Sequence, residues 1–161
     1  MATAIDTHVP VAGYGVLRDH GVLSCVGLGS CVAVMLHDAG TRVGALAHVL
    51  LPHESLSRDR SRPAKFGSTV TRFLLDEMRR HGARGEPVAR IVGGASMFGA
   101  LLATGVNMGE RNVDAVRRSL SECGVPLLGE DTGGDFGRSV YFDVTSGQVR
   151  VVSMTHGART I

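Results

Sequence analysis

A cysteine and a histidine stand near each other in the chain, each in surroundings that suit a reactive pair. Cys31 directly follows the glycine-rich turn Gly27-Leu28-Gly29-Ser30, and His48 interrupts an apolar run at residues 42–51. A thiol is a poor nucleophile until it loses its proton, and a neighbouring imidazole can accept that proton. The two side chains therefore fit the nucleophile and base of a hydrolase that acts on an amide or an ester.

The segment between these two residues predicts how they meet. Two stretches rich in apolar and β-branched residues flank Asp38-Ala39-Gly40-Thr41, which is typical of a turn. We expect a β-hairpin in which His37 lies opposite Arg42. Counting along both strands from that pair, Cys31 lies opposite His48. Opposed Cβ atoms are roughly 4.5–5.5 Å apart, so this register predicts a thiol beside an imidazole.

Such a pair needs further groups around it. Backbone N–H groups at Gly29 and Ser30, unhindered by large side chains, are expected to form an oxyanion hole. A third group should orient the imidazole, and the strand before the turn offers the side chains or carbonyls of Ser24 and Cys25. A second set of candidates is acidic and lies far along the chain: Glu130, Asp131 and Asp135.

Other roles for these residues stay open beside the catalytic one. A cysteine on an apolar strand is usually a small core residue, and a lone strand histidine is usually a hydrogen-bonded one. His37, His48 and His53 lack the tight spacing of metal ligands, so we predict no metal site. Cys25 and Cys31 lack the C-x-x-C spacing of a redox pair. The thiol chemistry needs no cofactor, and we expect none.

Composition predicts one soluble domain over residues 1–161, with residues 1–8 as a loose N-terminal arm. The chain is 43% hydrophobic and 20% charged, and its net charge of +2 includes no block of like charges, which argues against nucleic-acid binding. An odd number of cysteines and no secretory signal favour reduced thiols and a cytoplasmic location. No apolar run approaches the roughly 18 residues that a membrane span requires.

The remaining periodicities predict an α+β fold. Apolar residues recur at helical spacing in residues 65–81 and 109–123, and each segment is followed by a glycine. A polar loop is expected at residues 53–63 and a glycine-rich acidic loop at 130–137. Besides the hairpin, strands are expected at residues 9–17, 22–26, 87–92, 125–128, 139–144 and 148–154. We predict an α/β sandwich with two main helices and a mostly antiparallel, mixed β-sheet.

Several blocks of the sequence, in this order, are similar to a known family. They are GLGSCVAVMLHD, VGALAHVLLP, KFGSTVTRFLLDEM, GGASMF, GERNV and GGDFGRSVYFDVTSGQV. Together they resemble the CheD family of chemoreceptor glutamine deamidases, from about Gly13 onwards. The resemblance implies a hydrolase that converts particular glutamine side chains of methyl-accepting chemotaxis receptors to glutamate through a thioester. Its nucleophile falls on Cys31 and its base on His48.

The resemblance also implies a third site residue and two partners. The family often has a threonine six positions before the nucleophile, and this chain has Cys25 there, a weaker hydrogen-bonding group. The implied partners are cytoplasmic receptor helices and a CheC-type phosphatase, with the GGASMF and GERN blocks near the substrate groove. Tight packing is the alternative explanation for the glycines of these blocks.

Two other functions remain open on the same residues. One is a related hydrolysis, by a receptor methylesterase or a cysteine peptidase. The other is a non-catalytic adaptor that regulates a CheC-type phosphatase.

Overall fold

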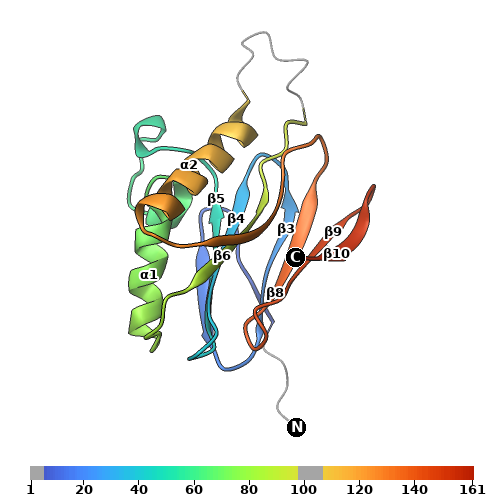
Figure 1. The fold of residues 1–161 in the computed structure, drawn as a ribbon. Helices are drawn as coiled ribbons and strands as arrows, with labels where there is room; N and C mark the ends of the chain where they lie inside the picture. The colour runs from blue at the N-terminus through green and yellow to red at the C-terminus, as the bar shows by residue number, and fades with distance from the viewer. Residues whose placement is uncertain (1–5, 98–106) are drawn as a thin grey trace.

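The computed structural model describes residues 6–97 and 107–161, which form two helices and two five-stranded sheets. Figure 1 shows three layers: the two helices cover one face of a sheet, and the second sheet packs on its other face. The predicted α+β class, with two main helices, is confirmed.

The elements follow one another along the chain as strands with two helical interruptions. The strands are β1 (Asp6–His8), β2 (Tyr14–Arg18), β3 (Val22–Leu28), β4 (Val32–Asp38), β5 (Val43–Val49), β6 (Val88–Gly93), β7 (Leu127–Thr132), β8 (Arg138–Asp143), β9 (Val149–Ser153) and β10 (Gly157–Thr160). The helices are α1 (Val70–Arg80) and α2 (Met108–Glu122), with short 3₁₀ turns η1 (Glu54–Leu56) and η2 (Pro63–Lys65).

The strands are paired mostly antiparallel in both sheets. The helix-covered sheet has the order β2-β5-β4-β6-β7, and the second sheet has the order β1-β3-β8-β9-β10. Each contains one parallel pair at its edge, β6 with β7 and β1 with β3, so both sheets are mixed as predicted.

The helices form where the apolar spacing predicts them. In α1, Val70, Leu74 and Met78 are buried at intervals of four residues, and Gly82 at φ +98° ends the helix. The helix begins at Val70 and not at residue 65, because the chain first makes the η2 turn. The hydroxyl of Thr69 donates to the carbonyl of Pro63 at 2.7 Å and joins this turn to the helix.

The hairpin of β4 and β5 is present, but its predicted register is wrong by two residues. Asp38 pairs with Val43, so His48 lies opposite Ala33 and not opposite Cys31. Asp38 stays in the strand because its carboxylate accepts hydrogen bonds from Gly40, Thr41, Arg84 and Gly85. Side chains alternate with a period of two, so a two-residue error preserves the face.

Three other predictions are corrected at the edges of the fold. Asp6–His8 is not a loose arm but the edge strand β1, while residues 1–5 lie outside the described part. The strand predicted at 9–17 begins only at Tyr14, because Ala12 (φ 65°) lies in a turn closed by a Gly13 N–H to Pro10 carbonyl bond. The acidic loop begins after Thr132, since β7 extends to that residue, and β10 was not predicted.

Neither described helix is long and apolar enough to cross a membrane.

Both faces of the helix-covered sheet pack into apolar clusters. The cluster towards the helices includes Val34 and Ala45. Towards the second sheet lie Ala33, Met35 and Leu46, packed against Cys25 and other residues of that sheet. Cys31 and His48 belong to this second face, because they follow the same alternation. The fold therefore places both in the layer between the two sheets.

Candidate active site

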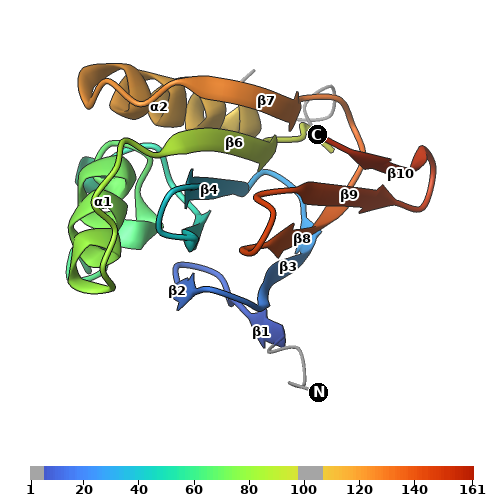
Figure 2. The same ribbon diagram turned by 60° about the horizontal axis from the view of Figure 1, so that its bottom comes forward.

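The candidate site lies where the chain crosses from one sheet to the other. Residues 29–31 connect β3 of the second sheet to β4 of the helix-covered sheet (Figure 2). Cys31, the last residue of this crossing, is half-buried and packs against the core between the sheets. His48 projects from β5 towards the same layer and is 3% exposed. Its opposite residue is Ala33, so Cys31 is its diagonal neighbour on the same face.

His48 is oriented by a main-chain carbonyl. Its Nδ1 lies 3.3 Å from the carbonyl oxygen of Val9, a buried residue whose own N–H donates to the Ser24 carbonyl at 2.7 Å. Since a carbonyl can only accept, Nδ1 carries the hydrogen and Nε2 keeps its lone pair. The imidazole is thus held in the tautomer that can take up a proton.

The segment from Val9 to Gly13 wraps the strand that carries His48. Besides the bond to the imidazole, the N–H of Ala12 donates to the carbonyl of His48, and the N–H of His48 donates to the carbonyl of Gly13. Sequence reasoning missed Val9 because every residue has a carbonyl, and no side-chain pattern marks the one that will be used.

Cys25 reaches the same carbonyl. Its Sγ donates to the Val9 oxygen at 3.5 Å, so Cys25 and His48 share one acceptor. The group that bonds the imidazole is therefore the Val9 carbonyl, and not a group of the strand containing Ser24 and Cys25.

Burial keeps the groups of the site uncharged. Burial raises the pKa of the Cys31 thiol above its ordinary value of 9.0. Burial also lowers the pKa of His48 below 6.5, partly opposed by the bond to Val9, and nearby His8 lowers it further. The pKa of Cys25 is raised to about 12 by burial and by the proximity of Cys31. Both directions favour a thiol and a neutral imidazole at neutral pH.

The three carbonyls of the turn before β4 are all held. Gly29 accepts from the N–H of Ala95, Ser30 from Nδ2 of Asn112, and Cys31 from the N–H of Gly94, each at 2.9 Å. The donors come from the GGASMF and GERNV blocks, which therefore both contact the candidate nucleophile turn. Part of the first block, from Phe98 onwards, lies outside the described residues.

The glycines of these blocks permit this close approach. Gly93 has φ +119°, and a Cβ there would lie 2.2 Å from the Cys31 carbonyl oxygen. A Cβ on Gly109, in the first turn of α2, would lie 2.4 Å from the carbonyl oxygen of Ala95. Tight packing thus explains both glycines. Gly93 packs against the turn that ends in Cys31, and Gly109 packs against the segment that holds this turn.

Two of the three acidic candidates bond arginines instead of the imidazole. Glu130 pairs with Arg117, and Asp131 accepts from Arg138 at 2.9 Å and from Arg159 at 2.8 Å. Asp135 is exposed in the loop after β7. Among residues 6–97 and 107–161, His48 has no hydrogen bond to any of these three acids.

The histidines considered as metal ligands each form a hydrogen bond to a different group. His37 bonds the Val144 carbonyl at 2.7 Å, and His53 bonds Ser55. Within the described ranges, no three His, Cys, Asp or Glu side chains are grouped closely enough to hold a metal ion.

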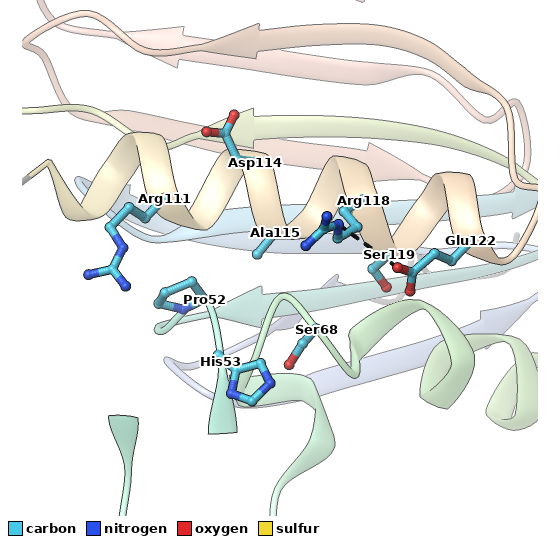
Figure 3. Close-up of a pocket in the computed structure, with 9 residues that line it drawn as sticks. All are labelled: Pro52, His53, Ser68, Arg111, Asp114, Ala115, Arg118, Ser119 and Glu122. Carbon is cyan, nitrogen blue, oxygen red and sulfur yellow. Dashed lines mark ion pairs between the residues drawn. The ribbon is translucent and has the colours of Figure 1, made fainter. Parts of the chain in front are cut away.

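A cavity of about 550 Å³ lies on another side of the molecule, between α2 and the loop after β5. Figure 3 shows its lining, in which Arg118 and Glu122 of α2 form an ion pair. Neither Cys31 nor His48 borders it. This cavity is therefore separate from the candidate site.

Fold and site together define an α+β protein with a candidate thiol–imidazole pair between two sheets. The family model described as "CheD chemotactic sensory transduction" matches residues 50–153. A chemoreceptor glutamine deamidase CheD of Thermotoga maritima is 42% identical over 144 residues, covering 89% of this chain and 88% of that protein. The chain belongs to the CheD family.

Two further relatives carry the name probable chemoreceptor glutamine deamidase CheD. The one from Moorella thermoacetica is 44% identical over 149 residues, or 91% of this chain and 89% of that protein. The one from Pyrococcus horikoshii is 39% identical over 153 residues, or 94% of each chain. The match to the family model begins after His48. The alignments with the three relatives cover 89–94% of this chain, so they also include residues 31–48.

Proposed function

We propose that this protein is a hydrolase that deamidates glutamine side chains of chemoreceptors, with Cys31 as nucleophile and His48 as base. The names of the relatives support the reaction and the substrate class. The observation that carries the residue assignment is the shared face of Cys31 and His48, with Nδ1 of His48 bonded to Val9 and Nε2 left with its lone pair.

The reaction begins with a neutral thiol. As Sγ of Cys31 attacks the carboxamide carbon, its proton passes to Nε2 of His48. The tetrahedral intermediate collapses when His48 returns the proton to the leaving nitrogen, which departs as ammonia. Water then attacks the thioester with His48 as base, releasing glutamate and restoring the thiol. One glutamine side chain and one water thus give one glutamate side chain and one ammonia, with no cofactor required.

Backbone groups supply the remaining requirements. The negative charge on the intermediate's oxygen is stabilised by N–H groups of the turn containing Gly29 and Ser30. The Val9 carbonyl stabilises the protonated imidazole through Nδ1, and Cys25 serves as an additional donor to that carbonyl. Cys25 thereby acts indirectly in the position where the family often has a threonine.

The substrate side chain belongs to a cytoplasmic receptor helix. Because the large cavity beside α2 does not lead to Cys31, the glutamine must project from a protein surface towards the half-buried thiol. A CheC-type phosphatase, the second partner implied by the family, would bind the same part of the surface.

The test is to incubate the protein with a cytoplasmic fragment of a chemoreceptor and locate Gln-to-Glu changes by mass spectrometry. Cys31→Ala is expected to abolish the changes and the release of ammonia. Cys123→Ala is the matched control, because this free thiol lies at the other end of the fold, after α2, and should leave the rate unchanged. Undiminished deamidation by Cys31→Ala would end the assignment.

The same assay separates the rival functions. Cleavage of the receptor backbone would indicate a peptidase, and release of methanol from a methylated fragment would indicate a methylesterase. Absence of any chemical change, together with normal chemotaxis in a Cys31→Ala strain, would favour a non-catalytic adaptor.

A further inference from the structure

Asn112 connects α2 directly to the turn that carries Cys31. Its side chain is 0% exposed, and its Nδ2 donates to two carbonyls, that of Ser30 at 2.9 Å and that of Leu50 at 3.1 Å. Its Oδ1 is buried without a hydrogen-bond partner among the described residues. An unsatisfied buried oxygen destabilises the fold, so the amide is not explained by stability alone.

The amide of Asn112 lies where the pairing of β4 with β5 ends. The ladder ends at Val32 and Val49, and one further step would bring Cys31 opposite Leu50. The N–H of Leu50 donates to the Lys65 carbonyl at 2.9 Å, and its carbonyl accepts from Asn112. Asn112 therefore bridges the carbonyls of Leu50 and Ser30 at this point.

The same amide fixes the direction of the Cys31 N–H. The carbonyl of Ser30 and the N–H of Cys31 belong to one planar trans peptide, in which the two bonds point in opposite directions. With the Ser30 oxygen held by Asn112, the N–H must point away from that side chain. No described residue accepts a hydrogen bond from it, whereas the Cys31 carbonyl is held by Gly94.

We propose that Asn112 is a positioning residue, which holds the Ser30–Cys31 peptide so that the Cys31 N–H donates to the oxyanion. The inference rests on the proposed thiol chemistry of Cys31. The carbonyls of Gly29 and Cys31 are held by the N–H groups of Ala95 and Gly94, so among the carbonyls of residues 29–31 only that of Ser30 is held by a side chain. A donor fixed before the reaction stabilises the developing charge without reorganisation.

Two reactions of the Cys31 thiol distinguish this role from a general structural one. Acylation by p-nitrophenyl acetate passes through a tetrahedral oxyanion, whereas alkylation by iodoacetamide does not. Asn112→Leu, similar in size but without donors, is expected to slow acylation of Cys31 by about 10²-fold, the usual effect of losing one oxyanion donor. Alkylation should stay within about twofold of wild type, because nothing in that reaction depends on the oxyanion.

Ser119→Ala is the control, because Ser119 is a second buried polar residue of α2 and has no bond to the turn. It should change neither rate. Equal acylation by wild type and Asn112→Leu would overturn the inference, as would an equal fall in both reactions. If Asn112→Leu does not fold, Asn112→Ser is compared in the same way. Failure of both to fold, with Ser119→Ala folded, would assign Asn112 to stability alone.

The assay uses no glutamine, so its result is independent of the receptor assay. A wild-type protein that is acylated at Cys31 but deamidates no receptor would contradict the proposed substrate and leave the role of Asn112 intact. A wild-type protein that is alkylated but never acylated at Cys31 would overturn the role of Asn112 as well.

Discussion

Two buried histidines lie at opposite ends of the layer between the sheets. His37 at the end of β4 is 6% exposed, and His48 near the end of β5 is 3% exposed. Both face the second sheet, and both bond a main-chain carbonyl, His37 through Nε2 to Val144 and His48 through Nδ1 to Val9. Burial and a carbonyl partner are therefore common to both and do not by themselves indicate a catalytic base.

The difference lies in what faces the second ring nitrogen. At His37, a Cβ added to Gly147 would lie 2.6 Å from Nδ1, and the ring of Phe142 packs edge-on with centroids 5.9 Å apart. The second sheet thus closes over that ring. At His48 the strand pairing ends, and Cys31 is the diagonal neighbour. The base role proposed for His48 therefore depends on the end of the strand pairing beside it and on the neighbouring thiol.

The largest predicted effect comes from replacing each histidine by leucine. His48→Leu should lower the deamidation rate by about 10²–10⁴-fold, because it removes the proton acceptor. His37→Leu should leave the rate near wild type. His37→Leu leaves the buried Val144 carbonyl without its imidazole donor and should lose about 1–3 kcal/mol of unfolding free energy. In His48→Leu the Val9 carbonyl keeps the Cys25 thiol as a donor, so the loss should be smaller. Rates are measured on a receptor fragment and stability by urea unfolding; equal rate losses in both variants would remove the distinction between the two ends.

The close approach of Gly93 to Cys31 gives the next effect. Gly93→Ala combines a strained φ of +119° with a Cβ 2.2 Å from the Cys31 carbonyl, so it should displace the turn and reduce both activity and stability. Gly124→Ala is the control, because it has φ +68° and open space around its Cβ. It should cost about 1–2 kcal/mol with no change in rate. A fully active Gly93→Ala would show that the position of the turn is unimportant.

A smaller effect concerns pH. Because the pKa of His48 is lowered, its neutral form persists below pH 6.5, so kcat/KM should fall only as pH drops through that lowered value. Between this value and 6.5 the unfolded chain binds a proton that the folded chain does not, so the unfolding free energy should decrease as pH falls below 6.5. His48→Leu should lose that part of the pH dependence of stability. An acid limb of kcat/KM at or above pH 6.5 would contradict the assignment.

Cys25 gives the smallest predicted effect. Its thiol shares the Val9 carbonyl with His48 but does not bond the imidazole, so Cys25→Ala should reduce the rate only by a few-fold and leave the pH profile in place. Cys25→Ser keeps a donor and should lie closer to wild type. A loss as large as that of His48→Leu would make Cys25 the principal orienting group in place of Val9.

The sequence was informative where side-chain types repeat or stand out. Helical spacing in the segments of α1 and α2 predicted both helices, and two apolar, β-branched stretches on either side of a turn predicted the hairpin. The register was wrong because Asp38 is held in β4 partly by Arg84 and Gly85, far along the chain. The length of the apolar runs contains no information about such contacts.

The parts of the site that could not be predicted are made by the main chain. The partner of His48 is the carbonyl of Val9, and two of the three carbonyls of the turn accept from backbone N–H groups. No pattern in the sequence indicated that Asn112 of the GERNV block contacts the turn, because its partners are the main-chain carbonyls of Ser30 and Leu50. Only the folded backbone specifies these contacts.

The proposed function requires that the Cys31 thiol itself form the acyl intermediate with receptor glutamine. The most direct measurement is to mix the protein with a receptor cytoplasmic fragment, quench with acid in the first turnover, and digest the mixture for mass spectrometry. We expect a thioester that joins a receptor glutamine to Cys31, with none at Cys25 or Cys123. Turnover of glutamine to glutamate without any adduct at Cys31, or with the adduct at another cysteine, would contradict it.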